Sequence, residues 1–365
     1  MPALLEVNNL RTYFRSRQGL SKAVDGLSFR LQPGEILGIV GESGSGKSVT
    51  ALSLMRLISP PGAIVGGEIR FEGRDILQLS PEAMRQLRGQ RMAMIFQEPA
   101  TSMNPVLPVG FQIVEAIQSH QRVAKKAARQ RALELMQSVG IPDAARRIGH
   151  YPHQFSGGML QRLMIAMGLA LSPALLIADE PVTALDVTIQ AQILDLLHSL
   201  RQQSHTAIVL ISHDMGVIAE VCDRVLVMYL GKVVEDAPVE ALFDNPQHPY
   251  TQGLLASIPS LDPEQRQLVA IPGTIPSPLD APKGCLFSNR CPQVMARCHQ
   301  QRPALRSATE HTGHVSHTDH TDQDQEQATV PYHARHQVAC FLHHEASEDD
   351  LLSASAYPAS GASHG

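Results

Sequence analysis

Aromatic residues are scarce in this sequence, and tryptophan is absent. Phe, Trp and Tyr make up 4% of the 365 residues, so the core must be built from aliphatic side chains, alanine and the 13 methionines. A long hydrophobic run is also missing: the longest apolar stretch, residues 163–178, is interrupted by Gly168, Ser172 and Pro173 and does not suit a membrane span of about 20 residues. Since no basic segment followed by an apolar run opens the chain, we expect a cytoplasmic protein without a signal peptide.

Positive charge is not concentrated anywhere in the chain. The net charge is −5, but residues 306–350 hold nine acidic and two basic residues, so the first 305 residues are nearly neutral at +2. Binding to a nucleic-acid backbone needs a basic field, and we therefore expect no nucleic-acid partner.

The apolar spacing predicts an α/β fold. Alternating or aliphatic runs predict strands at residues 4–10, 23–31, 35–40, 175–178, 206–211, 225–230 and 232–235. Helical spacing predicts helices at residues 48–58, 112–119, 125–139, 161–171 and 188–202. A helix that directly follows a strand begins a parallel α/β unit, and the two Ala-, Gln- and Arg-rich helices in the middle suggest an insertion between sheet strands.

The character of the sequence changes near residue 245, where Pro-rich loops replace the α/β pattern. We therefore expect one domain at residues 1–244 and a second at residues 245–345. Residues 307–337 are rich in His, Thr, Asp and Gln, and residues 346–365 are rich in Ser and Ala, so we expect both to be disordered. Ten of the 17 histidines lie at or beyond His299, and the His-rich loop is either polar filler or a transition-metal site.

A glycine-rich segment lies between the strand at 35–40 and the following helix. It reads Gly-Glu-Ser-Gly-Ser-Gly-Lys-Ser and matches the phosphate-binding pattern G-x-x-x-x-G-K-[ST]. Backbone N–H groups and the positive helix end would face phosphate oxygens, Lys47 would reach the β- and γ-phosphates, and Ser48 would hold Mg²⁺. The residues expected to contact the nucleotide are Gly41, Ser43, Gly44, Ser45, Gly46, Lys47, Ser48 and Val49.

The predicted strand at 175–178 and the two acidic residues after it also indicate a nucleotide site. The aliphatic run at 175–178 ends in Asp179 and Glu180, and a buried parallel strand would deliver both carboxylates to the edge where the glycine-rich loop lies. Asp179 would coordinate Mg²⁺ through water, and Glu180 would act as general base on the attacking water. Without the glycine-rich loop, an aliphatic run that ends in two acidic residues would indicate only a strand followed by a turn.

Residues 151–159, Tyr-Pro-His-Gln-Phe-Ser-Gly-Gly-Met, resemble the signature motif of ABC transporter ATPases. The resemblance implies that Ser156, Gly157 and Gly158, at a helix N-terminus, face the γ-phosphate of ATP held by the opposite subunit. It also implies a P-loop NTPase core of the ABC type, with an antiparallel β subdomain and a helical insertion at about residues 98–165. Met159 stands where the family has glutamine, so no amide contact is expected from it.

Three further residues resemble family motifs in the family's order. Gln97 resembles the Q-loop glutamine, which contacts Mg²⁺ and water and links the core to the helical insertion. Asp186 resembles the D-loop aspartate at the dimer interface, and His213 resembles the switch histidine that contacts the γ-phosphate. The resemblance implies catalytic roles for Gln97 and His213 beside Glu180, with Gln97 also near Mg²⁺.

Adenine requires a flat apolar surface, because ring stacking is open to every nucleotide. Phe14 aligns best with the family's adenine-stacking aromatic, and Tyr13 is the alternative. If two subunits enclose each ATP, hydrolysis requires dimer closure, and ATP then acts as an adhesive between subunits.

The C-terminal part resembles the extension of dipeptide and oligopeptide importer ATPases. The resemblance of the extension lies in residues 245–251 (Asn-Pro-Gln-His-Pro-Tyr-Thr), 270–273 and 284–298. Residues 96–105 and the Ser-Gly-Gly-Met variant in the first domain are also similar to this subfamily. The resemblance implies a peripheral protein on the cytoplasmic side of the membrane, with two transmembrane permease subunits and an extracytoplasmic binding protein as partners. The second ATPase of this subfamily is often a paralogue, which implies a heterodimer.

Four cysteines fall in this extension. Cys285, Cys291, Cys298 and Cys340 could together hold a [4Fe–4S] cluster or Zn²⁺, and a cytoplasmic location argues for ligation before disulfides. The resemblance favours the cluster, since members of the subfamily carry one here, and Zn²⁺ or four unligated thiols are the alternatives. Cys222 lies in the α/β body and is expected to be a buried small hydrophobe.

Other functions stay open at this point. A nickel or other small-solute importer of the same subfamily would share these motifs. A soluble ABC ATPase of translation or DNA repair fits less well, because there is one cassette and a nearly neutral body. A metal-sensing regulatory protein would not need the intact Glu180.

Overall fold

The structure is a computed structural model that describes residues 2–98, 102–183, 186–258, 270–308 and 335–343. The chain forms two compact units, residues 1–232 and 233–365. The boundary expected at residue 245 therefore lies within the second unit. Ala184, Leu185, most of the His-rich segment and the tail at 346–365 lie outside the described residues.

An antiparallel sheet forms the N-terminal part of the first unit. Its strands are β1 (Leu5–Ser16), β2 (Gly19–Leu31), β4 (Gly62–Phe71) and β5 (Arg74–Asp75), in the order β2-β1-β4-β5. Side chains on one face, among them Leu5, Val7 and Leu10, are fully buried. The alternating residues predicted β1 and β2 but not their full length, because β-bulges allow β1 to continue to Ser16. Strands β4 and β5 were not predicted.

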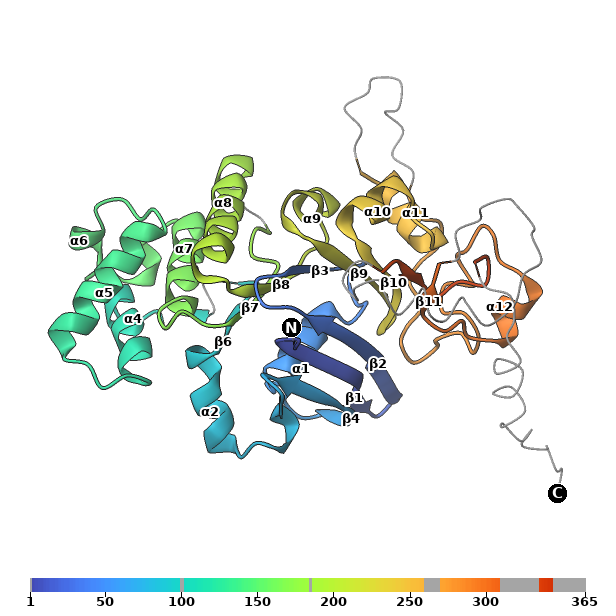
Figure 1. The fold of residues 1–365 in the computed structure, drawn as a ribbon, viewed down its shortest axis with the longest axis horizontal. Helices are drawn as coiled ribbons and strands as arrows, with labels where there is room; N and C mark the ends of the chain where they lie inside the picture. Colours follow the sequence, from blue (N-terminus) through green and yellow to red (C-terminus); the bar gives the residue numbers. More distant parts are fainter. Residues whose placement is uncertain (1, 99–101, 184–185, 259–269, 309–334, 344–365) are drawn as a thin grey trace. The chain divides into compact units, whose positions relative to one another are not determined.

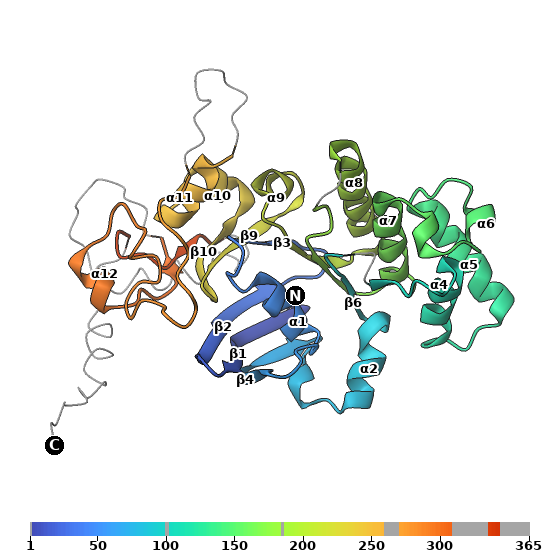
Figure 2. The ribbon, with the colours of Figure 1, turned by 180° about the vertical axis from the view of Figure 1, so that it is seen from behind.

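A second sheet contributes five parallel strands to the same unit. They are β3 (Ile36–Val40), β6 (Met92–Ile95), β7 (Leu175–Asp179), β8 (Ala207–Ile211) and β9 (Arg224–Tyr229), in the order β9-β3-β8-β7-β6. Every residue of β3, β7 and β8 is buried, as expected for parallel strands covered on both faces. Helices α8 (Val187–Ser204) and α9 (Met215–Val221) lie on one side, and α1 (Lys47–Leu54) and the antiparallel sheet lie on the other (Figures 1 and 2).

A group of helices separates β6 from β7 along the chain. It contains α4 (Val109–Gln118), α5 (Lys125–Ser138), α6 (Ala144–Arg147), η2 (Pro152–Gln154) and α7 (Gly157–Gly168). Before β6 the chain forms η1 (Ile76–Gln78) and α2 (Pro81–Gln90). Helix α7 begins four residues before the predicted start at residue 161, because the Ser156 side chain caps its N-terminus.

The second unit combines short strands with short helices. Strands β10 (Lys232–Pro238), β12 (Gln337–Val338) and β11 (Arg306–Ser307) pair in antiparallel fashion, with β12 in the middle. The helices are α10 (Val239–Asp244), α11 (Pro249–Ala256) and α12 (Ala296–Gln300). Helix α11 has proline at its first position, where no N–H is needed, and His248 as its N-cap.

Candidate functional site

The carboxyl ends of β3 and β7 form the site. Strand β3 runs into the glycine-rich loop and α1, and β7 ends at Asp179, with β8 between the two strands. The Ser48 hydroxyl, in the first turn of α1, donates a hydrogen bond to Asp179 Oδ1 at 3.1 Å. Parallel strands deliver their C-terminal residues to one edge, and here that edge brings both halves of the expected nucleotide site together.

The loop conformation depends on glycine at two positions. Gly46 has φ +103°, and a Cβ atom there would lie 2.3 Å from the Ala23 carbonyl oxygen. Gly41 has φ +148°, and its Cβ would lie 2.2 Å from the Met228 carbonyl oxygen. These approaches are too short for any side chain, so the loop can wrap in this way only with glycine at both positions.

Lys47 is buried at the base of the loop, with 6% of its surface exposed. Its Nζ donates hydrogen bonds to the carbonyl oxygens of Gly41 at 2.7 Å and Glu42 at 3.1 Å. Burial lowers the pKa of Lys47, and the nearby carboxylates of Glu180 and Asp179 counteract this shift. The ammonium group is thus held within the loop that matches the phosphate-binding pattern.

Two polar groups near Lys47 also fit the expected nucleotide and its cation. Ser45 Oγ is buried and has no hydrogen-bond partner among the described residues. Burial raises the pKa of Asp179, and the hydrogen bond from Ser48 opposes this shift. A buried hydroxyl and a desolvated carboxylate are suited to a phosphate oxygen and a cation, respectively.

Three side chains contact one carboxylate oxygen of Glu180. Its Oε2 accepts a hydrogen bond from Gln97 Nε2 at 2.9 Å and lies 3.4 Å from His213 Nδ1. Thr183 Oγ1 donates to the same oxygen at 3.0 Å. The structure therefore joins the three residues expected to be catalytic, which follow β6, β7 and β8, at one carboxylate oxygen.

Sequence reasoning missed Thr183. A threonine three residues after an acidic residue in a turn can bond its side chain, and this spacing was the available signal. Glu180 itself has φ +48°, an uncommon conformation for a residue with a side chain. Its backbone N–H donates to the Ile211 carbonyl oxygen at 2.9 Å, which fixes this turn against the end of β8.

The signature segment lies elsewhere in the first unit. Ser156 is exposed and accepts a hydrogen bond from the Met159 N–H at 3.4 Å, so it caps α7 as the sequence predicts for a helix start. Helices α7 and α1 lie apart in both views (Figures 1 and 2), so the structure does not bring Ser156 to the loop of its own chain. The sulfur of Met159 accepts a hydrogen bond from Arg147 Nη1 at 3.8 Å.

Asp186 and the glycines of the signature segment lie beside α8. Asp186 caps this helix by accepting the Ile189 N–H at 2.9 Å. A Cβ atom on Gly158 would lie 2.9 Å from Ile189, whereas one on Gly157 would meet nothing within 4 Å. Gly158 therefore permits close packing of α7 on α8. Gly157, at the start of α7, has free space where a side chain would be.

The two candidate aromatic residues of β1 differ in their surroundings. The Tyr13 hydroxyl donates to Asp25 Oδ1 at 2.6 Å, and burial together with this bond raises its pKa to about 12. The Phe14 ring packs against the backbone of Gly62 and is half-buried. Tyr13 is thus bound across the sheet, which favours Phe14 as the stacking surface.

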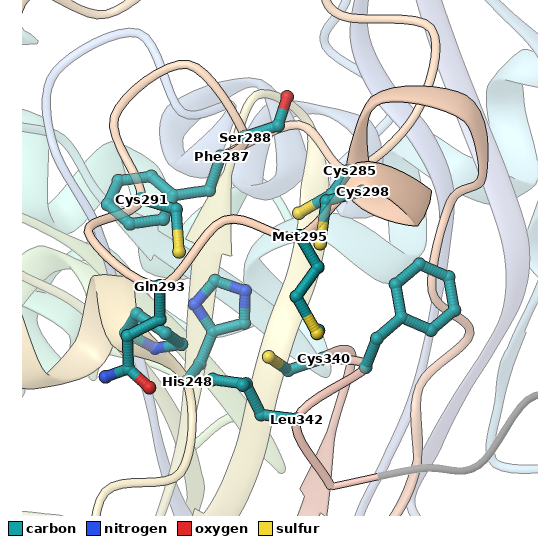
Figure 3. Close-up of a pocket in the computed structure, with 12 residues that line it drawn as sticks. His248, Cys285, Phe287, Ser288, Cys291, Gln293, Met295, Cys298, Cys340 and Leu342 are labelled. Atoms are coloured by element: carbon teal, nitrogen blue, oxygen red, sulfur yellow. The ribbon is translucent and has the colours of Figure 1, made fainter.

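The four cysteines of the second unit share one pocket (Figure 3). Its lining also includes His248, Phe287, Met295 and Phe341. Burial raises the pKa of Cys285 to about 11 and that of Cys340 to about 12, and the neighbouring cysteines add to both shifts. Among the described residues, however, no three His, Cys, Asp or Glu side chains are arranged to share a metal ion.

Cys222 does not belong to this group. It is buried in the first unit, and burial raises the pKa of its thiol, as expected for a small hydrophobic residue.

In the part of the chain that the structure describes, no helix has the length and apolar character needed to cross a bilayer.

Two family models match the chain. The ABC transporter model matches residues 24–183, and a model of the C-terminal region of oligopeptide and dipeptide transporters matches residues 234–298. The oligopeptide transport ATP-binding protein AppD of Bacillus subtilis is 52% identical over 306 residues, which are 84% of this chain and 93% of AppD. The dipeptide transport ATP-binding protein DppD of Escherichia coli is 50% identical over 303 residues, 83% of this chain and 93% of DppD.

The chain belongs to the ABC transporter ATP-binding proteins of the peptide-importer family. Its fold agrees with this family. The dimeric structure of a bacterial ABC transporter cassette superposes with a TM-score of 0.59 at 25% identity, over 64% of this chain and 98% of that cassette. The expected ABC ATPase fold with mixed α/β sheets is thereby confirmed.

Substitution of Gly46 by alanine is expected to weaken ATP binding by at least about tenfold, which corresponds to about 1.4 kcal/mol. The added Cβ would meet the Ala23 carbonyl oxygen at 2.3 Å and force the loop to move. ATP titration measures the affinity, and thermal unfolding checks the fold. Gly44→Ala is the matched control, because Gly44 also has positive φ (+81°) but its Cβ would meet nothing within 4 Å. Equal affinities for the two variants would contradict this role for Gly46.

Proposed function

We propose that this ATPase hydrolyses ATP at the edge formed by β3 and β7 and couples hydrolysis to the uptake of di- or oligopeptides. The observation that carries the catalytic part is the convergence of Gln97, His213 and Thr183 on Glu180 Oε2. The peptide substrate is supported by AppD and DppD, whose names assign them to oligopeptide and dipeptide transport.

Each residue of the loop and its surroundings has a defined task in this proposal. The N–H groups of residues 41–49, together with Lys47, bind the phosphates, and the half-buried Phe14 supports adenine. Ser48, Asp179 and Gln97 are the residues that would hold Mg²⁺, and their hydroxyl, carboxylate and amide oxygens are the hard ligands this ion prefers. When bound, Mg²⁺ neutralises charge on the β- and γ-phosphates.

Glu180 acts as the general base. As the water oxygen attacks the γ-phosphorus, its proton passes to Glu180, and the bond to the leaving ADP breaks. The hydrogen bonds from Gln97 and Thr183 hold the carboxylate in place, and His213 lies on the same side, where its imidazole can orient the water. No covalent intermediate is required.

The signature segment serves a second ATPase subunit. Ser156 is exposed and lies on a helix that is apart from α1, so its contact with a γ-phosphate would be made in the partner's site. Asp186 would lie at the same interface. We propose a heterodimer with a paralogous subunit, in which bound ATP joins the two subunits and hydrolysis releases them.

Glu180→Gln is expected to keep ATP binding but lower the hydrolysis rate by about 10²–10⁴-fold, because the amide cannot accept the proton. Phosphate release measures turnover, and size-exclusion chromatography with MgATP measures the closed dimer, which should accumulate. Glu82→Gln, on the exposed side of α2, is the control and should behave as the wild type. Brisk turnover in Glu180→Gln would overturn the assignment of the base.

We propose that exposed apolar side chains on the segment after Gln97 and on the helices that follow it, together with Phe96, provide a docking site for the permease subunits. It consists of Phe96, Val106, Phe111 and Tyr151, with exposures of 37%, 74%, 46% and 40%. The Val109 N–H donates to the His150 carbonyl oxygen at 2.9 Å, which holds the start of α4 beside Tyr151. A partner that presses on this surface can move Gln97, and through it Glu180. Such docking would place the protein on the cytoplasmic side of the membrane, with an extracytoplasmic binding protein delivering substrate.

Val106→Glu is expected to weaken assembly with the permease by about tenfold or more, because a charge would be buried in an apolar contact. Basal ATPase activity of the isolated subunit should not change. Co-purification with the permease and transport by the reconstituted complex measure the effect. Val65→Glu, equally apolar and 54% exposed on β4, is the matched control. Normal assembly of the Val106 variant would place the docking surface elsewhere.

The four cysteines of the shared pocket support a [4Fe–4S] cluster as a resident cofactor. Cys285, Cys291, Cys298 and Cys340 supply four sulfur donors inside an otherwise largely apolar lining. Ligation would deprotonate thiols whose pKa burial raises. Because no three of the described His, Cys, Asp or Glu side chains are arranged to share a metal ion, the cysteine side chains would also have to move to bind the cluster. Zn²⁺ is the alternative that the same donors allow.

Anaerobically purified protein is expected to contain four iron and four sulfide ions per chain, and Cys298→Ser should lower both. Iron, acid-labile sulfide and zinc analyses measure the content, and visible absorbance provides an independent signal. Cys222→Ser is the control, since Cys222 lies in the first unit. Stoichiometric zinc without colour would exclude the cluster.

A further inference from the structure

A pair of buried hydroxyl groups joins strand β1 to helix α1. Thr12 lies in β1, Ser53 lies in the last turn of α1, and both residues are fully buried. The distance between Thr12 Oγ1 and Ser53 Oγ is 2.8 Å. The strand and the helix lie side by side in both views (Figures 1 and 2). The hydrogen bond therefore links two elements that are far apart in the sequence.

The hydrogen bonds of Ser53 determine the direction of this contact. A serine hydroxyl carries one proton, and Ser53 Oγ donates it to the Val49 carbonyl oxygen at 2.6 Å. Thr12 Oγ1 is therefore the donor, and Ser53 Oγ is the acceptor. The two bonds form a short chain from β1 to the first turn of α1, in which every hydroxyl proton has a fixed acceptor.

Apolar contacts alone would hold α1 against the sheet without fixing its position along β1. Val24, which pairs with Thr12 across the sheet, and Leu54, which follows Ser53, are both fully buried. The attraction between such side chains is not directional, whereas a hydrogen bond weakens steeply when its atoms shift or its angle changes. The bond between Thr12 and Ser53 therefore fixes β1 at one position along α1.

Each of the two joined elements carries one part of the proposed nucleotide site. Helix α1 begins with Lys47 and Ser48, which bind phosphate and Mg²⁺ in that proposal. Phe14, which supports adenine there, lies two residues after Thr12 in β1. Strand β1 pairs with β4 without a register shift between these two positions, so Thr12 and Phe14 lie on the same face of the strand, the face that contacts α1.

We propose that Thr12 is a positioning residue for ATP, because it sets where Phe14 lies relative to the phosphate-binding end of α1. This role rests on the proposed function, in which Phe14 supports adenine and the glycine-rich loop binds the phosphates. A nucleotide that contacts both elements binds most tightly when their spacing is already correct, since no binding energy is then lost in ordering them. A ligand that contacts only the loop does not depend on this spacing.

Two substitutions break the hydrogen bond from opposite sides. Thr12→Val removes the donor and keeps the branched shape of the side chain, and Ser53→Ala removes the acceptor. Titration of the full-length protein with ATP and with ribose 5′-triphosphate, which lacks adenine, measures both affinities in the presence of Mg²⁺. Thermal unfolding checks the fold of each variant.

Thr206→Val is the matched control. Thr206 is also buried, and its hydroxyl oxygen lies 2.8 Å from Ser204 Oγ, so it belongs to a similar hydroxyl pair. It directly precedes β8, at the end of the strand opposite to the site. Any effect of losing a buried threonine hydroxyl in general should therefore be seen in this variant as well.

Thr12→Val and Ser53→Ala are each expected to weaken ATP binding about three- to tenfold and to leave the affinity for ribose 5′-triphosphate unchanged. Thr206→Val should change neither affinity. In a Phe14→Ala background, which lacks the stacking surface, Thr12→Val should cause no further loss of ATP affinity, because the two residues act on the same contact.

Equal losses for the two ligands would indicate a general disturbance of α1 and would overturn the positioning role. An unchanged ATP affinity in Thr12→Val, or an additive loss in the double variant, would overturn it too. A failure of the proposed function gives a different result: Phe14→Ala alone would then bind ATP as the wild type does, and the adenine surface itself would be wrongly assigned.

Discussion

The hydrogen bond between Ser48 and Asp179 links the two segments on which the nucleotide site depends. Strand β8 separates β3 from β7, so the loop after β3 and the acid at the end of β7 meet only because the parallel strands end at a common edge. The residue after Asp179 is Glu180, and its turn is fixed against the end of β8. Strand order therefore sets the distance between the glycine-rich loop and Glu180, and no single motif could do so.

In the proposed mechanism, Glu180 also connects hydrolysis to the rest of the complex. One oxygen of its carboxylate contacts side chains that follow three different strands, and one of these, Gln97, directly follows Phe96, a residue of the docking site proposed for the permease. In the proposed complex, a displacement of Gln97 would therefore alter the position of Glu180. Because proton transfer depends steeply on geometry, a small movement is sufficient to change the rate.

Much of this site could be predicted from the sequence, because motif spacing identified the loop, the two carboxylates, Gln97 and His213. Local patterns could not predict contacts that depend on tertiary structure. The hydrogen bond from Thr183 to Glu180 and that from Tyr13 to Asp25 arise only once the turn and the antiparallel strands are in place. His248 is a similar case, since its motif marks the start of α11 but not the cysteines that the fold brings around its ring.

Lys47 donates to two carbonyl oxygens of its own loop, and this has a consequence for repeated turnover. A cation buried without counter-groups would be expelled toward solvent, and the loop would lose its shape each time product departed. Here the backbone solvates the ammonium group internally. We expect this internal solvation to preserve the shape of the loop between rounds, so that Lys47 needs only to exchange carbonyl oxygens for phosphate oxygens when the next nucleotide binds.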